Sequence, residues 1–267
     1  MPRHAFSVSL AAFAIAAFAF SAAHAEDWPR FRGVAGDGIS AETDWNPAAV
    51  TKGNVKWRKD IGLGYSTASV VGDKLYISGW KNGRDYIYCL NADTGEEVWS
   101  INYAADEWNK MHDGGPAGTP TIDDGKLYVM SRVGQLGCFD ASNGEGVWAI
   151  DLRQKYDLKP PTWGFSGSAV IEGDVLYLDA GKILALNKKT GAEIWVTKDY
   201  GEAYSTPQLF SYNGKEYVAA FPEYGLVILE RDTGKQVAST RWKTSYGVNA
   251  ATPVIGEDGS RIFISSG

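Results

Sequence analysis

The sequence predicts an all-β fold, a β-propeller of four-stranded antiparallel blades, and three observations support this. Ten Trp and fourteen Tyr accompany 31 Gly in 267 residues. Short β-branched and aromatic runs alternate with Gly, Asp and Asn, and no long segment has helical periodicity, which is typical of strands joined by tight turns. Two sequence markers also recur in phase along the chain, which indicates repeated structural units.

The first marker is a turn followed by tryptophan, four residues after a glycine. It occurs at Thr94–Trp99, Asn143–Trp148 and Thr190–Trp195, and a fourth copy at Thr233–Val237 has Ala238 at the Trp position. Glycine suits a tight hairpin because it adopts positive φ readily. We expect each Trp to stand on a strand face and cover the neighbouring blade. The predicted docking residues are Trp57, Trp99, Trp148, Trp195, Gly95, Gly144, Gly191 and Gly234.

The second marker is a hydroxyl residue that opens an apolar stretch and precedes an aromatic strand. The hydroxyl residues are Thr67, Thr119, Ser168, Thr206 and Thr252, and the aromatic residues are Tyr76, Tyr128, Tyr177, Tyr217 and Phe263. Each unit therefore contains four strands, A to D, with a hairpin between A and B and a second between C and D. Four strands in about 45 residues are typical of a propeller blade. A solenoid of hairpins is the structural alternative.

These markers divide the chain into three parts. Residues 1–25 are expected to be a signal peptide, 26–53 an N-terminal extension and 54–267 the propeller. The propeller is interpreted as an orphan outer strand at 54–60, blades at about 65–103, 117–150, 166–197 and 204–243, and a half blade at 249–267.

The beginning of the chain predicts export. Arg3 and His4 precede the apolar run Ala5–Phe20, and Ala23-His24-Ala25 fits a cleavage site. We expect cleavage after Ala25 and a periplasmic or secreted protein; an uncleaved anchor is the alternative. No Cys lies near the cleavage site, and no second long apolar run follows, so neither a lipid anchor nor a membrane span is expected after cleavage. A formal charge of −6 without a basic stripe argues against nucleic acid as partner.

Two segments resemble a known family. The stretch Leu90–Trp99 (LNADTGEEVW) resembles the tryptophan-docking repeat of dehydrogenases that use pyrroloquinoline quinone (PQQ), and of their non-enzymatic relatives. Asp27–Gly33 (DWPRFRG), followed by Asp37-Gly38, is similar to the start of exported proteins with PQQ-binding-like propeller repeats. The propeller lipoprotein of the outer-membrane barrel-assembly machinery shares such repeats and is not an enzyme. The resemblance is specific for fold and weak for activity, because these repeats serve several functions.

The number of blades follows from the repeats and the resemblance together. Family propellers have seven or eight blades, whereas this sequence contains about four and a half. Trp57 behaves like an outer-strand Trp with no strands of its own blade before it, and the sequence ends at Ile262–Gly267, just after strand B of a fifth unit. We therefore interpret the chain as part of an incomplete ring, a C-terminally truncated member of the family. A natural small propeller is the alternative.

The cysteines and histidines suggest no reactive centre. Cys89 and Cys138 each lie six residues before a hairpin glycine, at positions filled by Ala185 and Ile228 in later units. Equivalent positions of packed sheets are roughly 10 Å apart, beyond the reach of a disulfide, so two buried thiols are expected. His112 is expected in an exposed loop, and the other two histidines lie in the signal peptide. No metal site is therefore expected.

Other motifs of catalysis are also missing. The hairpin carboxylates Asp73, Asp123, Asp124, Asp174 and Asp258 are typical turn formers. No cluster has the spacing of a calcium loop, and no Ser-His-Asp set, phosphate loop or haem attachment motif is present.

The best candidates for ligand binding lie in the loops that lead into strand A, at the expected channel mouth. They are Tyr65, Trp163, Phe165, Tyr204, Tyr246 and Asn249. Aromatic side chains with one amide suit a flat or sugar-like ligand. Alternatively these residues plug the funnel and pack blade on blade. Trp163, restrained by Pro160-Pro161, and Asn249 are the two residues most worth testing.

Three functions follow. The first is an exported scaffold that binds envelope proteins or a small ligand without chemistry of its own. The second, implied by the resemblance, is a PQQ- and calcium-dependent oxidoreductase of alcohols or sugars whose remaining ligands lie in further blades. The third is a carbohydrate-binding propeller.

Overall fold

The computed structural model describes residues 26–43, 46–51, 53–110 and 112–266. Within them, four four-stranded antiparallel sheets and one two-stranded sheet follow one another along the chain. Among the described residues, the regular secondary structure is thus almost wholly β-strand, with only two short helices, α1 (Pro47–Thr51) and α2 (Leu152–Tyr156). The predicted all-β class and its four-stranded antiparallel blades are confirmed.

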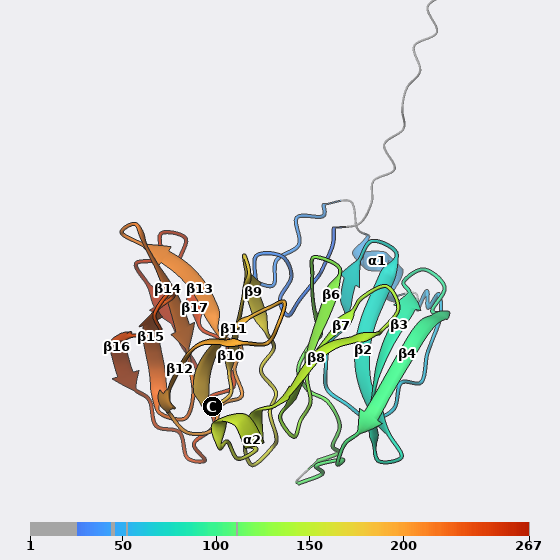
Figure 1. The fold of residues 1–267 in the computed structure, drawn as a ribbon. Coiled ribbons are helices and arrows are strands. Elements are labelled where there is room, and N and C mark those ends of the chain that lie inside the picture. Colours follow the sequence, from blue (N-terminus) through green and yellow to red (C-terminus); the bar gives the residue numbers. More distant parts are fainter. Residues whose placement is uncertain (1–25, 44–45, 52, 111, 267) are drawn as a thin grey trace, which may run out of the picture.

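Each blade consists of four consecutive strands (Figure 1). Blade 1 contains β1 (Ser69–Val71), β2 (Lys74–Lys81), β3 (Arg84–Asn91) and β4 (Glu97–Ala104). Blade 2 contains β5 (Thr121–Asp123), β6 (Lys126–Met130), β7 (Gln135–Asp140) and β8 (Gly146–Asp151). Blade 3 contains β9 (Val170–Glu172), β10 (Val175–Asp179), β11 (Lys182–Asn187) and β12 (Glu193–Asp199). Blade 4 contains β13 (Gln208–Tyr212), β14 (Lys215–Ala220), β15 (Gly225–Glu230) and β16 (Gln236–Arg241).

A last pair of strands, β17 (Val254–Ile255) and β18 (Ile262–Phe263), lies beside blade 4 and contacts it through β13. The sheets run from blade 1 at the right of Figure 1 to blade 4 at the left. Three apolar clusters fill the spaces between consecutive blades. The core of the molecule is therefore a series of interfaces between sheets, as expected of a propeller.

The pairing of the third and fourth strands explains the position of each Trp. All four blades have the same register shift in this pair, for example between Cys89 and Leu90 in blade 1. The extra residue is an exposed aliphatic side chain, Val98 in blade 1. A bulge bends the strand and re-aims the next side chain. In this way Trp99 comes to lie opposite Cys89, on the face that meets blade 2.

Each of four indoles, from Trp57, Trp99, Trp148 and Trp195, lies on the hairpin of the blade that follows it. Trp99 Nε1 donates to the Ala141 carbonyl at 3.1 Å, and a Cβ added to Gly144 would lie 2.9 Å from the ring. The same contacts join Trp57 to Ala92 and Gly95, Trp148 to Lys188 and Gly191, and Trp195 to Arg231 and Gly234. Two features thus favour glycine in this hairpin: its φ is positive, and a side chain would clash with the indole ring that lies against it.

Hydroxyl groups join the blades near their inner strands. Thr67 Oγ1 and Thr119 Oγ1 are 2.7 Å apart, Thr119 N donates to Ser168 Oγ at 2.8 Å, and Ser168 N donates to Thr206 Oγ1 at 3.0 Å. Thr119, Ser168 and Thr206 are buried. The second sequence marker therefore forms an inner hydrogen-bonded belt, while the Trp residues join the outer parts of the same blades.

An N-terminal strap, residues 27–37, crosses the inner strands. Trp28 exchanges backbone hydrogen bonds with Val70 on β1, Asp27 Oδ1 accepts from Gly72 N, and Pro29 O accepts from Ile122 N on β5. In Figure 1 the strap is the blue segment that lies above the blades. It therefore covers one end of the region enclosed by the inner strands.

The two thiols point into different interfaces. Cys89 is buried between blades 1 and 2, and Cys138 is buried between blades 2 and 3. Both are free, as their equivalent positions in the repeat predicted. Their pKa values are raised by burial.

Two further predictions concern the beginning of the chain. The expected signal peptide, residues 1–25, lies outside the described residues. Residues 54–60, interpreted as an orphan outer strand, belong to no sheet in the structure, although Trp57 lies on blade 1 as described above. No helix among the described residues has the length and apolar character of a membrane span.

Candidate functional site

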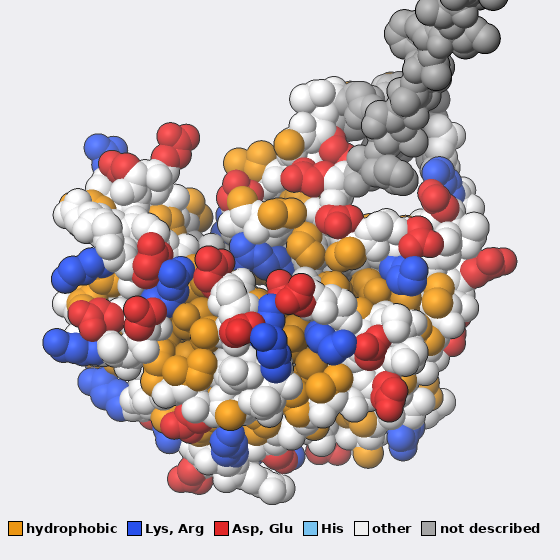
Figure 2. All heavy atoms as spheres, turned by 45° about the horizontal axis from the view of Figure 1, so that its top comes forward, with side chains coloured by type: hydrophobic (Ala, Val, Ile, Leu, Met, Phe, Trp, Pro, Cys, Tyr) orange, Lys and Arg blue, Asp and Glu red, His pale blue; other side chains and the backbone are white. Residues whose placement is uncertain are grey.

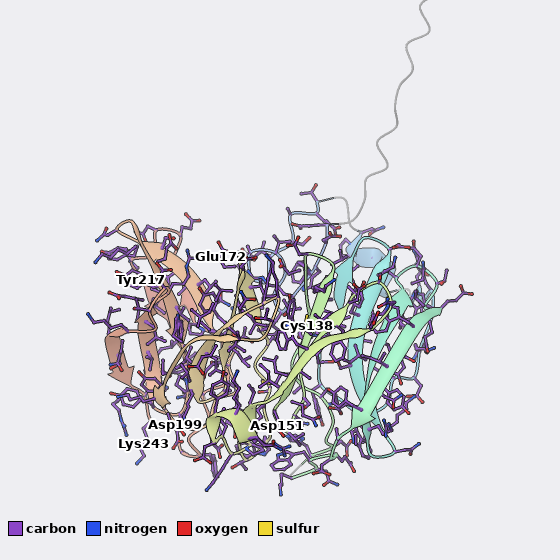
Figure 3. All side chains as sticks on the ribbon, viewed as in Figure 1. Cys138, Asp151, Glu172, Asp199, Tyr217 and Lys243 are labelled. Atoms are coloured by element: carbon purple, nitrogen blue, oxygen red, sulfur yellow. The ribbon has the colours of Figure 1, made fainter. Side chains whose placement is uncertain are left out.

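The propeller has two unlike ends. The hairpin end carries the turns between the first two and the last two strands of each blade, together with the strap. The connector end carries the turns between the second and third strands, and the segments that join one blade to the next: 105–120, 152–169, 200–207 and 242–253. In Figure 3, Glu172 marks the hairpin end, and Asp151, Asp199 and Lys243 mark the connector end.

A buried arginine holds two of the connectors together. Arg132, in the turn between β6 and β7, donates from Nη1 to Gly115 O at 2.7 Å and from Nε to Trp163 O at 2.9 Å. Its guanidinium also lies over the Tyr65 ring, 5.6 Å from the ring centroid. Burial lowers the pKa of Arg132, while Tyr65 and Asp85 oppose this effect. Arg132 thus positions Tyr65 and Trp163.

Glu202 joins the connector 152–169 to the connector 200–207. Its Oε1 accepts from Thr162 N at 3.1 Å and Thr162 Oγ1 at 3.0 Å, and its Oε2 accepts from the Tyr204 hydroxyl. The Tyr204 and Trp163 rings are 5.9 Å apart and tilted. Burial raises the pKa of Tyr204. This network brings two of the predicted ligand-binding aromatics together.

Asn249 has a different environment. It is fully buried, and its Nδ2 donates to Pro222 O at 2.8 Å. Its Oδ1 is buried without a hydrogen-bond partner. The side chain ties the last connector to the turn between β14 and β15, and it does not line any of the grooves described below.

The remaining predicted site residues are separate from one another. Phe165 is fully buried beside Gly134, Tyr65 is half exposed with its ring edge against His112, and Tyr246 is 83% exposed. Only the pair Trp163 and Tyr204 comes together. The structure therefore distributes five of the six residues over three connectors and places Tyr65 ahead of β1, rather than gathering them around one ligand.

A groove crosses the connector end of blades 3 and 4. It consists of two cavities, of about 660 and 360 Å³, that share Asp199 and Glu223. The larger is lined by the aromatic residues Tyr200, Tyr224, Trp242 and Tyr246 and by Arg241 and Lys243. The smaller extends to Asp157, Lys159 and Glu202.

Four charged side chains of the groove are available for ion pairs with a binding partner. Among the described residues, Asp199, Glu223, Arg241 and Lys243 take part in no ion pair within 4.0 Å. Arg241 lies over the Tyr224 ring at 4.9 Å, and the Tyr200 and Tyr224 rings meet edge to face at 5.8 Å. The groove thus combines rigid aromatic surfaces with unpaired charges of both signs.

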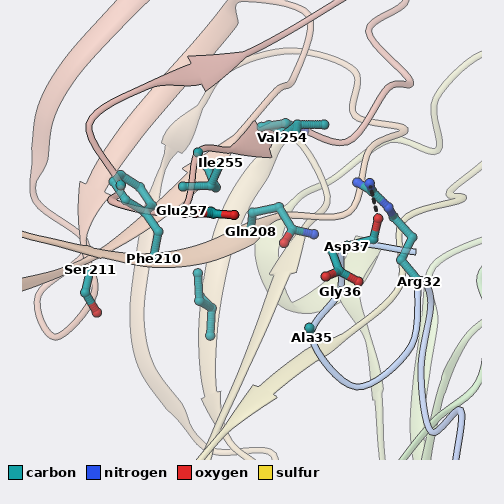
Figure 4. A pocket seen from close by; sticks show the side chains of 14 residues that line it. Arg32, Ala35, Gly36, Asp37, Gln208, Phe210, Ser211, Val254, Ile255 and Glu257 are labelled. Atoms are coloured by element: carbon teal, nitrogen blue, oxygen red, sulfur yellow. Dashed lines mark hydrogen bonds between the residues drawn. The ribbon is translucent and has the colours of Figure 1, made fainter. Parts of the chain in front are cut away.

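The hairpin end has a cavity of its own, of about 330 Å³, between the strap, β13 and β17 (Figure 4). Arg32 reaches back to Asp37 O at 2.8 Å, which closes the strap on itself beside the cavity. Gln208 and Phe210 of β13 and, from β17 and the turn after it, Ile255 and Glu257 also line the cavity. Basic and acidic side chains are interspersed over this end of the molecule (Figure 2).

Two carboxyl groups are buried away from these cavities. Burial raises the pKa of Asp85 to about 7, against the opposing effects of the Tyr103 hydroxyl and Arg132. Burial likewise raises the pKa of Asp179 to about 7, while Gly181 N donates to its Oδ1 at 3.1 Å. In both residues Oδ2 is buried without a partner.

These residues do not fit a quinone site with calcium. Among the described residues, no group of three or more Asp, Glu, His or Cys is placed to hold a metal ion. Calcium requires six to eight oxygen ligands. The predicted aromatic residues and Asn249 do not converge either, because Phe165 lies beside Gly134 whereas Asn249 donates to Pro222 O.

Sequence reasoning missed Arg132, Glu202 and the groove charges. The sequence gives one indication of the role of Arg132. A cation in the apolar stretch between two strands is unusual unless its N–H donors form hydrogen bonds inside the protein. Glu202, Glu223 and Arg241 have no such indication, because their role depends on which connectors and turns meet in space.

Comparison with known proteins agrees with this architecture. The family model described as outer membrane protein assembly factor BamB matches residues 47–195 and again 83–267. The chain belongs to this family. Because the two matches overlap and together extend over most of the chain, the family's repeats account for all four blades.

Two kinds of relative share the repeats. BamB of Burkholderia pseudomallei is 27% identical over 69% of this chain and 45% of its own length. The quinoprotein alcohol dehydrogenase PedH of Pseudomonas putida is 29% identical over 43% of this chain and 20% of its own length. The chain thus spans less than half the length of these relatives.

Solved structures show the same fold. The quinohemoprotein alcohol dehydrogenase of Comamonas testosteroni superposes on 89% of this chain and 44% of its own, with a TM-score of 0.61 and 17% identity. BamB of Moraxella catarrhalis superposes on 73% of this chain and 52% of its own, with a TM-score of 0.51 and 17% identity. At these identities the likeness concerns the fold alone.

Proposed function

We propose that the chain is an exported, non-catalytic propeller that binds a protein partner of the bacterial envelope, with the groove at the connector end as its contact surface. The observation that carries the proposal is the groove itself, in which four aromatic side chains surround unpaired charges of both signs. Tyr, Trp and Arg are the residues that contribute most to protein interfaces.

Family membership supports this function. The matching family is described as an outer membrane assembly factor, and we infer that the partner is a component of that assembly machinery. The apolar run and cleavage pattern at the start of the chain support export to the periplasm. The lack of convergence among the aromatic residues and Asn249 favours a binding role over oxidation of an alcohol or sugar.

Site-specific photo-crosslinking tests the contact surface. A photoreactive residue replaces Tyr246, which is exposed in the groove, and in a matched control it replaces Tyr212, which is exposed at the hairpin end. We expect position 246 to yield a covalent adduct with an outer-membrane assembly protein in intact cells, and position 212 to yield none. Equal adducts at both positions would contradict the assignment of the groove.

A titration with PQQ in the presence of calcium tests the alternative chemistry. We expect no saturable change in visible absorbance and no turnover of ethanol or glucose by the purified chain. Stoichiometric PQQ binding with calcium-dependent turnover would overturn the non-catalytic function. Binding in a glycan array, competed by partner protein, would instead reassign the groove to carbohydrate.

A further inference from the structure

The charges of the connector-end groove follow a fixed order along its length. Arg241 and Lys243 line only the larger cavity. Asp199 and Glu223 line both cavities and therefore lie where the two meet. The smaller cavity is acidic, with four carboxylates and one cation, Lys159, among its lining residues. The groove is thus basic at one end and acidic from its middle to the other end.

Backbone N–H groups position the two shared carboxylates. Asp199 Oδ1 accepts from Gly201 N at 2.8 Å, and Glu223 Oε2 accepts from Glu202 N at 3.3 Å. Glu223 N donates in turn to Glu202 O at 2.7 Å, which joins the turn between β14 and β15 to the connector 200–207. A Cβ added to Gly201 would lie 2.4 Å from Glu223 Oε2, so the close approach of this carboxylate requires glycine. Both carboxylates are therefore in place before a partner binds, which lowers the entropic cost of binding.

Both ends of the groove present their charges to solvent. Asp199 and Glu223 are exposed, and no described residue donates a hydrogen bond to Asp199 Oδ2 or Glu223 Oε1. At the basic end Arg241 and Lys243 are exposed too, and the Arg241 guanidinium lies over the Tyr224 ring at 4.9 Å from its centroid. Each end thus offers one sign of charge to a binding partner.

We propose that the groove binds an extended segment of the partner protein in which the charges are segregated. Its acidic side chains lie against Arg241 and Lys243, and its basic side chains lie against Asp199 and Glu223. A segment of one sign only would place like charges against one end of the groove, which is unfavourable. The acidic end suits a basic side chain rather than a metal ion, because among the described residues no three acidic, His or Cys groups are placed to hold one. This inference rests on the proposed function and adds the chemistry and direction of the bound segment.

Titration of the whole chain with a capped heptapeptide tests the order of charges. The peptide carries two glutamates at one end, a central tyrosine and two arginines at the other. The matched control has glutamine and citrulline in their place, which keep the shape and remove the charges. Binding is followed by ¹H–¹⁵N NMR at the amides of Gly201 and Lys243. We expect about tenfold weaker binding of the uncharged peptide, because several exposed ion pairs together contribute on the order of a factor of ten. Equal affinities, or no saturable shift with the charged peptide, would overturn the proposal.

A spin label on the peptide reports its direction in the groove. A label at the glutamate end is expected to broaden the amides of Lys243 and Thr244 more strongly, since these residues line the larger cavity only. A label at the arginine end is expected to broaden those of Gly201 and Glu202, which line the smaller cavity only. The reverse pattern, or the same pattern from both ends, would contradict the proposed order.

Variants of the acidic end remove charge without removing backbone contacts. Asp199→Asn combined with Glu223→Gln keeps the oxygens that accept from the N–H groups of Gly201 and Glu202. We expect this variant to bind peptides with arginine or citrulline equally well and to keep its preference for glutamate over glutamine. A folded variant that still prefers arginine would overturn the assignment of the acidic end.

Variants of the basic end are expected to have the opposite effect. Arg241→Gln combined with Lys243→Gln should lose the preference for glutamate and keep the preference for arginine. Asp232→Asn, at an exposed position of the hairpin between β15 and β16, is the control and should keep both preferences. Loss of both preferences in either double variant would show that the two ends do not act separately, against the proposal.

These results are separate from those of photo-crosslinking. An adduct with an assembly protein at position 246, together with no charge preference of the peptides, would refute the order of charges and leave the proposed function intact. Charge-dependent peptide binding in the proposed direction without such an adduct would support the segregated segment and refute the assembly partner.

Discussion

At the residue scale, the Trp of the repeat contributes through both its area and its N–H group. Each indole packs on the next blade, and its Nε1 satisfies a carbonyl of the hairpin. A lost side chain leaves a cavity and also an acceptor without its donor. The tyrosine of the second strand adds to the same contact, since the Tyr128 and Trp148 rings are tilted at 6.1 Å.

Substitutions of Trp148 separate these contributions. Trp148→Phe keeps most of the ring and loses the bond to Lys188 O, so we expect a loss of about 1 kcal/mol in the free energy of unfolding from the bond, with a further loss from the smaller ring. Trp148→Ala is expected to lose about 3–5 kcal/mol because the docking area is lost too. Urea denaturation measures both values. Equal effects of the two substitutions would show that ring packing contributes little.

The buried Asp179 makes stability depend on pH. Burial raises the pKa of Asp179 to about 7 in the folded protein, above the 3.8 of an ordinary carboxyl. The folded state therefore binds the proton more tightly than the unfolded state, and this residue's contribution to stability falls as pH rises from about 4 to 7. We expect Asp179→Asn to stabilise the protein at pH 8 by a few kcal/mol, on the order of 1–4, and by less at pH 5.

Urea denaturation at the two pH values checks this expectation. Asp258→Asn is a useful contrast, because hydrogen bonds from Ser260 lower the pKa of the exposed Asp258 carboxyl. The contribution of Asp258 is present above about pH 4 and is lost only at lower pH, which is the opposite sign, so Asp258→Asn is expected to have the same effect at pH 5 and at pH 8. A gain from Asp179→Asn that is equal at pH 5 and pH 8 would show that the protonation state of the buried group does not change between the two pH values.

At the element scale, the hairpin between the last two strands depends on its neighbour. Gly191 has φ of +69°, and a Cβ there would lie 2.9 Å from the Trp148 ring. Gly173, in the hairpin between β9 and β10, has φ of +56° but nothing within 4 Å of an added Cβ. Both glycines thus have a positive φ, but only Gly191 has an indole ring packed against it.

Alanine at the two positions therefore measures the docking contact. We expect Gly173→Ala to lose about 1–2 kcal/mol of stability from positive φ alone. Gly191→Ala is expected to lose about 1–3 kcal/mol more, because the methyl group displaces the indole of the preceding blade. Thermal or urea unfolding of both variants provides the comparison, and identical losses would argue against a tight ring contact.

The blades could be predicted from the sequence, whereas the contacts of the connectors could not. The blades follow from local patterns, because the hairpin glycine, the bulge and the Trp are set by residues within one unit. The equivalence of Cys89 and Cys138 was readable for the same reason. The connectors were less predictable, since Arg132, Glu202 and Asn249 are placed by contacts between residues 17 to 40 positions apart in the sequence. The six predicted binding residues all precede the first strand of a unit but differ in exposure, and nothing local determines where each one points.

At the scale of the whole molecule, the strap connects units that are distant in the sequence. Backbone bonds join it to β1 and β5, and Arg30, which is partly buried, lies within the electrostatic reach of Glu172 on β9. The cavity of Figure 4 brings its Arg32–Asp37 turn against β13 and β17. One short segment is therefore hydrogen-bonded to β1 and β5, lies within electrostatic reach of β9, and borders a cavity with β13 and β17. It also protects their exposed edges, which is a known need of inner strands in open sheets.

Hydrogen exchange tests whether the strap acts as a unit. Arg30→Glu places a negative charge beside Glu172 and Asp37, and like charges repel when partly buried. We expect faster exchange of the Gly72 and Ile122 amides, which donate to Asp27 and Pro29 of the strap. The amide of Leu184, inside blade 3, is expected to keep its rate. Lys56→Glu, at an exposed ion pair with Asp93, is the control for charge reversal alone. Unchanged exchange of both the Gly72 and the Ile122 amides in the Arg30 variant would show that the hydrogen bonds of Asp27–Pro29 hold the strap without the charge of Arg30. Faster exchange throughout blade 3 would show instead that the strap stabilises the whole propeller and does not only close one end of it.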